Sequence, residues 1–353
     1  MIVLGIESSC DETAAAIVED GRILHSNIVA TSMDLHAAYG GVVPEIAARS
    51  HIEAIMPVVN QALTEAKMTW DAIDAIAVTY GAGLGGSLLV GVLSARTLAI
   101  TKNKPLYAIN HVEGHVYANF ITKTALPGYV LPTKQPVFPI LALIVSGGHS
   151  QLALFRNHFD YTLLGQTQDD AIGEAFDKVA KIIGLPYPGG PSVSKKALEG
   201  DAHAYAFPKA KLAGKYDFSF SGLKTAVLRT AQAAVGADFT LPSHELPARL
   251  SEAQKADIAA SFEHLAIETV VDKTMLAFEE FEPKSVVIAG GVAASSELRQ
   301  QLSERLPIPV AYTDFKLCTD NGAMIATLGC FKAMHGQFTA DPYTLDIAPN
   351  LSM

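Results

Sequence analysis

The chain has 353 residues, of which 49% are hydrophobic and 18% charged, and its net charge is −10. This composition excludes a disordered chain, and the length suffices for two domains with separate cores. The acidic balance disfavours a general nucleic-acid coat but leaves room for a local basic patch or an RNA-binding helper subunit. Three cysteines are too few, and odd in number, for a disulfide framework, so a reducing cytoplasm fits best.

The first apolar segment, residues 2–6, has no basic lead-in and is followed by Glu7, Asp11 and Glu12. We therefore expect no signal peptide. No apolar run is long and uninterrupted enough to span a membrane, so we expect no membrane contact.

The first part of the chain alternates between strand and helix patterns after an opening set of strands. Asp20-Gly21 is a tight hairpin signal between the second and third of these strands. Apolar periodicity and turn residues predict strands at 2–6, 14–19, 22–30, 73–79 and 105–110, and helices at 44–66, 87–101 and after 110.

The same order restarts after a proline-rich linker between residues 127 and 139. The pattern predicts strands at 140–145, 151–156, 161–166, 285–289 and 309–313, and helices at 170–183, 252–281, 295–305 and from about 320. We interpret this as a duplicated α/β lobe with a nucleotide cleft between the copies. The expected N-terminal lobe is 1–135 plus 320–353, and the C-terminal lobe is 136–319. Two unrelated α/β domains are the alternative, which the matching hairpins disfavour.

The segment His111-Val112-Glu113-Gly114-His115 is the most informative motif. Two histidines four residues apart lie on one face of a helix, close enough to bind one metal ion. A metalloprotease helix would carry its general-base Glu directly after the first His, whereas Glu113 lies about 200° around the helix from His111. A metal here would therefore position or polarise a substrate. The alternative is a pair of surface histidines.

Short glycine turns follow several predicted strands. A P-loop and a Gly-x-Gly-x-x-Gly dinucleotide motif are both absent. Backbone N–H groups in glycine turns can approach phosphate oxygens closely, so turns in both lobes favour a nucleotide site. These turns are Gly81–Gly86, Ser146-Gly147-Gly148, Gly189-Gly190 and Gly290-Gly291.

Four carboxylates, at three places in the chain, have competing interpretations. Asp11 and Glu12 lie in a polar turn that suits phosphate or a cation, or is an ordinary Asx turn. Asp177 could accept a hydrogen bond from a ribose hydroxyl, or pair with Lys181 on an exposed helix face. Asp320 precedes the last helix and could be its N-cap.

Seven collinear motifs closely resemble one family, the universal tRNA N6-threonylcarbamoyladenosine transferases, once labelled O-sialoglycoprotein endopeptidases. The resemblance covers residues 2 to about 335 and implies the actin/sugar-kinase/Hsp70-like fold. The motifs are Cys10–Thr13, Gly40–Glu45, Asn110–His115, Val145–His149, Gly173–Lys178, Asp217–Thr225 and Gly290–Val292.

The resemblance implies a reaction: threonylcarbamoyl-AMP gives its carbamoyl group to N6 of the adenosine 3′ of the tRNA anticodon and releases AMP. It also implies one Fe or Zn ion held by His111, His115 and Asp320. The implied nucleotide contacts, to the adenylate and to ATP or ADP as a further ligand, are Ile144, Val145, Ser146, Gly147, Gly148, Asp177, Gly190, Gly291 and Ser295. Ser295 replaces the Asn usual in the family and shortens that contact.

For the mechanism, we expect Asp11 or Glu12 to take the amine proton or to organise the water around the metal. Lys195, Lys196 and Lys224 belong to a lysine stretch that could bind tRNA phosphates, or simply solubilise the surface. The resemblance implies, in bacteria, a paralogous dimerisation subunit that binds the first lobe and a small P-loop ATPase.

Three other functions compete with the transferase. A metallopeptidase lacks its base at position 112, which is Val. A sugar or acetate kinase rests on fold analogy alone and leaves the histidine pair unexplained. A non-catalytic assembly subunit would be expected to have lost the histidines.

Overall fold

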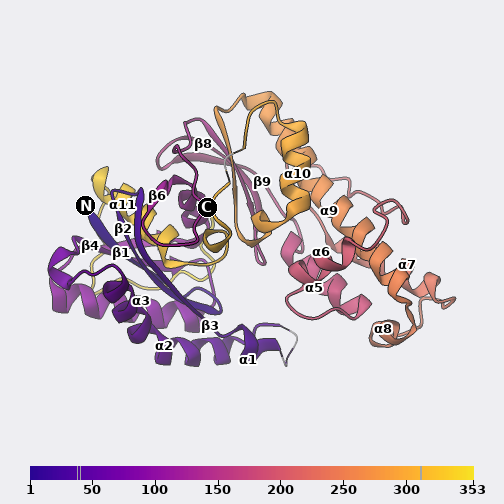
Figure 1. Cartoon of the computed structure of the whole chain (residues 1–353), viewed down its shortest axis with the longest axis horizontal. Coiled ribbons are helices and arrows are strands. Elements are labelled where there is room, and N and C mark those ends of the chain that lie inside the picture. The colour runs from indigo at the N-terminus through magenta and orange to yellow at the C-terminus, as the bar shows by residue number, and fades with distance from the viewer. Residues whose placement is uncertain (38, 40, 311) are drawn as a thin grey trace. The chain divides into compact units, whose positions relative to one another are not determined.

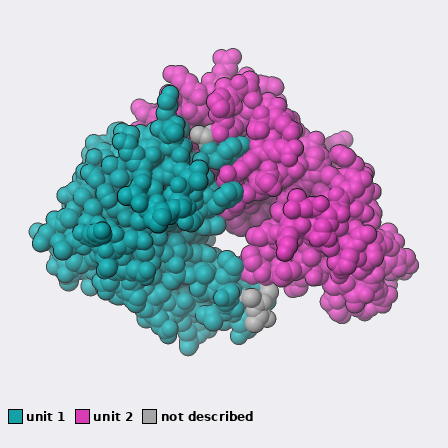
Figure 2. Space-filling model, in the orientation of Figure 1, with its two compact units in different colours: residues 1–136, 311–353 teal, residues 137–310 magenta. Residues whose placement is uncertain are grey.

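The structure, a computed structural model, describes residues 1–37, 39, 41–310 and 312–353. The chain divides into two compact units, residues 1–136 with 311–353 (unit 1) and residues 137–310 (unit 2), coloured separately in Figure 2. Residues 312–319 thus belong to unit 1, although the sequence placed them in the C-terminal lobe. How the two units face each other, and hence the cleft between them, stays a prediction.

Unit 1 is built on a six-stranded sheet with the order β5-β4-β1-β2-β3-β6. Its strands are β1 Ile2–Glu7, β2 Glu12–Glu19, β3 Ile23–Thr31, β4 Ala75–Gly81, β5 Leu106–Asn110 and β6 Lys123–Thr124. Its helices are α1 Met33–Ala37, α2 Pro44–Glu65, α3 Gly85–Lys102, α4 His111–Tyr117 and α11 Gly322–Met334.

Both faces of this sheet are covered, which explains why β1 is apolar along most of its length. Leu4 and Ile6 pack with α2 and α3 on one face. Gly5 points to the other face, where an added Cβ would lie 2.3 Å from the Ala326 nitrogen of α11. Figure 1 shows α2 and α3 on one side of the strands and α11 on the other.

Unit 2 is built on a four-stranded sheet with the order β10-β7-β8-β9. Its strands are β7 Ile140–Val145, β8 Ser150–Asn157, β9 Asp160–Gln166 and β10 Ser285–Ala289. Its helices are α5 Ile172–Ile183, α6 Gly189–Ala197, α7 Ser221–Ala234, α8 Leu246–Arg249, α9 Glu252–Phe281 and α10 Ser296–Arg305. The long helix α9 packs against α5, α6, α7 and α10, and Ser251 begins it with a capping box.

The two sheets share a topology, which confirms the predicted duplication. In each, three consecutive strands pair antiparallel, and a later strand joins the first in parallel: β4 beside β1, and β10 beside β7. The predicted strand at 309–313 was wrong, because its described residues form no strand. No helix within the described ranges is both long and apolar enough to cross a membrane.

Candidate metal centre and glycine turns

The metal centre begins where β5 runs directly into α4. Asn110 ends the strand and caps the helix, its Oδ1 accepting the Val112 and Glu113 N–H groups at 2.9 and 3.3 Å. His111 and His115 follow one turn apart, with ring centroids separated by 4.7 Å. Both are buried, so the alternative of two surface histidines was wrong.

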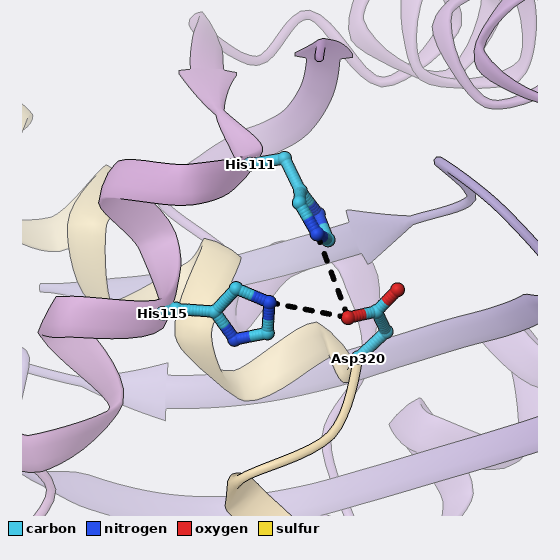
Figure 3. Close-up of side chains that lie close together, drawn as sticks. All are labelled: His111, His115 and Asp320. Atoms are coloured by element: carbon cyan, nitrogen blue, oxygen red, sulfur yellow. Dashed lines mark ion pairs between the residues drawn. The ribbon is translucent and has the colours of Figure 1, made fainter. Parts of the chain in front are cut away.

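Asp320 completes the centre from the loop before α11. Its Oδ1 lies 3.2 Å from His115 Nε2 and 3.5 Å from His111 Nε2, and Figure 3 shows both rings pointing at this carboxylate. The N-cap of α11 is Asn321, which accepts the Met324 N–H at 3.0 Å. The alternative role of Asp320 as a helix cap was therefore wrong, and its carboxylate faces the histidines instead.

The donor set fits a divalent transition metal. One ligand atom from each of His111, His115 and Asp320 lies within 4.8 Å of the others. Both ring nitrogens of His115 are buried, and no described residue hydrogen-bonds to them, so a cation would satisfy Nε2. Two imidazoles and one carboxylate leave further coordination positions for a substrate oxygen and suit either Zn or Fe.

Glu7 begins the polar turn expected to suit a phosphate or a cation, but its role beside His111 was not predicted from the sequence. It is fully buried at the end of β1, where it accepts hydrogen bonds from the Ser9 N–H and the Thr79 hydroxyl at 2.6 and 2.5 Å. Its Oε2 also lies 3.2 Å from His111 Nδ1. A carboxylate at Nδ1 orients the ring and leaves Nε2 to face a metal.

A topological signal could have identified Glu7. Parallel strands end at the same edge of a sheet, so a carboxylate at the end of β1 must lie near the residues that end β4 and begin α4. The histidine pair alone points only to α4.

The buried charges at the centre affect one another. Burial alone would lower the pKa of His111, but the carboxylates of Asp320 and Glu7 raise it to about 9. Burial would raise the pKa of Glu7, but the neighbouring His111 lowers it below its usual range. A protonated His111 therefore occupies the electrostatic position that a metal cation would take.

Asp11 ends the loop between β1 and β2, and Glu12 is the first residue of β2, at the same edge of the sheet. Burial, followed by the negative charges of Asp320 and Asp11, raises the pKa of Glu12 to about 10. Without a cation nearby, Glu12 thus holds a proton at neutral pH. The backbone oxygen of Asp11 accepts hydrogen bonds from the Ser32 N–H and hydroxyl, which fixes the loop.

Glu113 occupies the other side of α4, as the helical spacing predicted. It is buried and does not belong to the metal group. Burial raises its pKa, while the Lys332 ammonium opposes that rise. No peptidase-type base therefore follows His111.

In unit 2, the predicted nucleotide contacts gather around the ends of β7 and β10. Ile144 and Val145 are fully buried in β7, so only their backbone could meet a ligand. Ser146 closes the following turn by donating its N–H to His149 O at 2.8 Å, and Gly147 and Gly148 are exposed, with nothing within 4 Å of an added Cβ.

The remaining predicted contacts flank these turns. Asp177 Oδ1 accepts the Gly189 N–H at 2.6 Å, which ties the start of α6, where Gly190 lies, to α5. The structure shows this bond in place of the alternative pairing with Lys181. Gly291 starts a short 3-10 helix after β10, and Ser295 caps α10 by accepting the Leu298 N–H.

Most of the predicted basic stretch is neutralised by acidic neighbours. Lys196 pairs with Glu199 and Glu252, and Lys224 lies 3.4 Å from Asp170. Lys209 and Lys215 also form ion pairs, with residues of α9. Lys195 is exposed and forms no ion pair with the described part of the chain. Sequence alone could reveal only the local pair of Lys196 with Glu199, because the other acidic partners lie far away along the chain.

Structural comparison supports the two-unit fold. The chain resembles HypF of T. kodakarensis with a TM-score of 0.60 at 13% identity, over 97% of this chain and 49% of that one. It also resembles full-length HypF in the phosphate- and nucleotide-bound form, with a TM-score of 0.55 at 12% identity, over 94% and 46%. At such identities the likeness concerns the fold alone, and it agrees with the expected actin/sugar-kinase/Hsp70-like class.

Sequence comparison identifies the family. The sequence model of tRNA N6-adenosine threonylcarbamoyltransferase matches residues 23–327. Curated proteins of that name are 50% identical in Thermomicrobium roseum, over 95% of this chain and 93% of the relative, and 48% identical in Caldicellulosiruptor saccharolyticus, over 100% and 98%. The chain therefore belongs to the tRNA N6-adenosine threonylcarbamoyltransferase family.

Proposed function

We propose that this enzyme transfers the threonylcarbamoyl group from threonylcarbamoyl-AMP to N6 of the adenosine 3′ of the tRNA anticodon, releasing AMP. The convergence of His111, His115 and Asp320 within a family of this activity carries the proposal. A cytoplasmic location follows from the tRNA substrate. The adenine amine is a weak nucleophile and the donor an activated anhydride, so catalysis consists chiefly of alignment and charge stabilisation.

Residues of unit 1 hold one Zn or Fe ion in this proposal. When bound, the ion would supply a Lewis acid for a donor oxygen. Glu7 fixes the His111 ring so that Nε2 faces the ion. Asp11 or Glu12 accepts the proton that leaves the amine, and a cation beside Asp320 would lower the pKa of Glu12 from its raised value and so free it to act as a base.

Residues of unit 2 bind the nucleotide in this proposal. The exposed backbone N–H groups of Gly147 and Gly148 receive phosphate oxygens, and Gly190, Gly291 and Ser295 contact the adenylate, or ATP or ADP. The open space around Gly147 and Gly148 supports this role, because a ligand can approach their backbone.

Transfer of labelled threonine to anticodon-loop adenosine, with and without bacterial partner proteins, tests the reaction. The His115→Ala protein should lose its bound metal. In an assay that contains the bacterial partner proteins, its transfer rate should fall at least about 100-fold, the scale of losing an essential electrostatic group. Full metal content together with full transfer would refute the ligand assignment.

An unchanged single-turnover rate in Asp11→Asn plus Glu12→Gln would exclude both proton acceptors. Release of peptides from a glycoprotein would favour the peptidase alternative.

Contacts of Lys195, Lys196 and Lys224 with tRNA are part of the proposal. Lys224 lines a groove of about 550 Å³ with Lys181 and His244, where a tRNA phosphate would compete with Asp170 for its ammonium group. Each phosphate contact adds about 0.9 to the slope of the logarithm of the tRNA binding constant against the logarithm of the salt concentration. Lys224→Ala should therefore reduce the size of that slope by about one. Lys67→Ala, in unit 1, is the control. An unchanged slope for Lys224→Ala would contradict this contact.

A paralogous dimerisation subunit would bind unit 1 through α2 and α3. These helices pack together and expose apolar side chains one turn apart, Ile52 and Met56 on α2, and Leu89 and Leu93 on α3. Ile52→Glu plus Leu93→Glu should weaken the heterodimer more than about tenfold, because each apolar anchor contributes above 1 kcal/mol. Phe239→Glu in unit 2, which also replaces an exposed apolar side chain, is the control. The small P-loop ATPase completes the expected assembly.

A further inference from the structure

Residues 340–353 form a segment, here called the return segment, that comes back from α11 to β4 and β5. The Ala340 N–H donates to Leu106 O, and the Ala348 N–H to Tyr80 O, both at 2.7 Å. Farther along, Pro349 O accepts the Gly83 N–H at 3.1 Å. The segment thus follows the strands to the edge of the sheet where α4 begins.

Two further contacts fix its path. The Arg96 guanidinium of α3 donates to three carbonyls of this segment, at 2.6 Å to Pro342 O, 2.6 Å to Tyr343 O and 3.2 Å to Leu345 O. Gly81 allows close approach, since an added Cβ would lie 2.1 Å from Ala348 O. These contacts leave the segment little freedom where it meets the metal centre.

Asn110 connects the return segment to the metal-bearing helix. Its Nδ2 donates to Ser352 O at 3.0 Å, while its Oδ1 caps α4. A side-chain amide is directional, so the carbonyl of Ser352 selects the orientation that turns the amide oxygen toward the helix. A flipped amide would present two donors to the helix N–H groups and lose the cap.

We infer that Asn110 is a positioning residue through which the return segment fixes the geometry of the two histidines. The seven residues of α4 are too few for a helix to be stable alone, so its first turn depends on the cap. His111 is the first residue of this helix and His115 the fifth. The inference rests on the proposed metal site.

A thermodynamic cycle tests the link with four proteins: the full chain, a chain ending at Pro349, Asn110→Asp, and both changes together. Asn110→Asp keeps an acceptor for the cap but removes the donor to Ser352. In the protein that keeps Asn110, truncation should weaken Co²⁺ binding about five- to tenfold. In the Asn110→Asp protein, truncation should weaken it less than about twofold, because the hydrogen bond to Ser352 is already lost there. Equal loss in both backgrounds, or none, would overturn the inference.

Amide exchange in the metal-free protein provides an independent measurement. Truncation should accelerate exchange at Val112 and Glu113, and unchanged exchange would refute the link even if metal affinity fell. If the truncated chain does not fold, faster exchange in Asn110→Asp alone supports the link and unchanged exchange refutes it. Phe338→Ser, at a side chain 98% exposed, is the control and should change neither quantity. His111→Ala in the Co²⁺ assay tests the metal assignment separately: unaltered binding would refute that assignment, and exchange would still decide on the return segment.

Discussion

The strand ends of unit 1 and unit 2 present different chemical groups on the same topology. After β1, the chain continues into buried Ser8 and Ser9, and Glu7 is fully buried among hydrogen-bond donors. After β7, it continues into exposed Gly147 and Gly148. One sheet edge presents ionisable side chains held by hydrogen bonds, and the other presents exposed glycines with open space beside them.

This difference shows how a duplicated fold can specialise. Metal ligands need side chains held rigidly, and buried hydrogen bonds to neighbouring strands provide that rigidity. A phosphate needs only unobstructed backbone donors, which glycine provides without further support. Substitutions should therefore disturb the two edges in different ways.

The largest effect should follow from Glu7→Gln. The amide preserves the size of the side chain but removes the negative charge beside His111 Nδ1. Loss of such a supporting partner typically costs ten- to about 100-fold in metal affinity. Chelator competition with Zn²⁺ or Co²⁺ measures this. Glu113→Gln is the control, because Glu113 is also a buried glutamate but lies outside the metal group. Equal losses of metal affinity in both variants would contradict the role of Glu7 in orienting His111.

Glu12→Gln should alter the pH dependence of stability in the metal-free protein. The pKa of Glu12 is raised from 4.5 to about 10, so the folded state retains a proton that the unfolded state releases. The stability from this proton is complete below pH 4.5 and is lost as pH rises toward 10. As pH rises through that window, the free energy of unfolding of the variant should therefore increase relative to that of the wild type, by up to about 1.4 kcal/mol per pH unit.

Urea unfolding of both metal-free proteins at several pH values measures this difference. Added Zn²⁺ should reduce the advantage of the variant, because a cation near Asp320 favours the charged form of Glu12. A constant difference across the whole window would show that Glu12 is not desolvated.

At the edge of unit 2, Gly147→Ala should leave folding unchanged. Nothing lies within 4 Å of the added methyl group, so it can disturb only a ligand. We expect a three- to about tenfold rise in KM for threonylcarbamoyl-AMP, the scale of one impaired hydrogen bond. Gly290→Ala is the contrasting variant: φ is +88° there, and the methyl would lie 2.4 Å from Val145 O. It should destabilise the fold by about 1–3 kcal/mol. An unchanged KM in Gly147→Ala would contradict the proposed phosphate contact.

Periodicity predicted the fold well because most helices and strands have clear local signals. The pattern placed β7, β10 and α9 at their observed bounds. The histidine pair was visible for the same reason, since its spacing is local. The role of Glu7 beside His111 was missed because it depends on β4 and α4, which lie far away in sequence but end at the same sheet edge. The lysine pairs with acidic residues of α9 were missed for the same physical reason.

The smallest effect should come from Ser295→Asn, which restores the residue that the family resemblance leads us to expect. Ser295 caps α10, and Asn caps helices equally well, so the free energy of unfolding should change by less than about 0.5 kcal/mol. The longer amide can reach a nucleotide that the serine hydroxyl does not. It should tighten binding of the donor by up to about threefold, which corresponds to a fraction of the free energy of one hydrogen bond. Ser295→Ala separates the two roles, because it should lose about 1 kcal/mol of stability without gaining affinity. Calorimetric titration with a non-hydrolysable analogue of the donor measures the binding. If Ser295→Asn weakens donor binding, the site in unit 2 requires the smaller serine side chain at this position. Ligand binding in unit 2 would then depend on a precisely placed side chain, as it is proposed to do in unit 1.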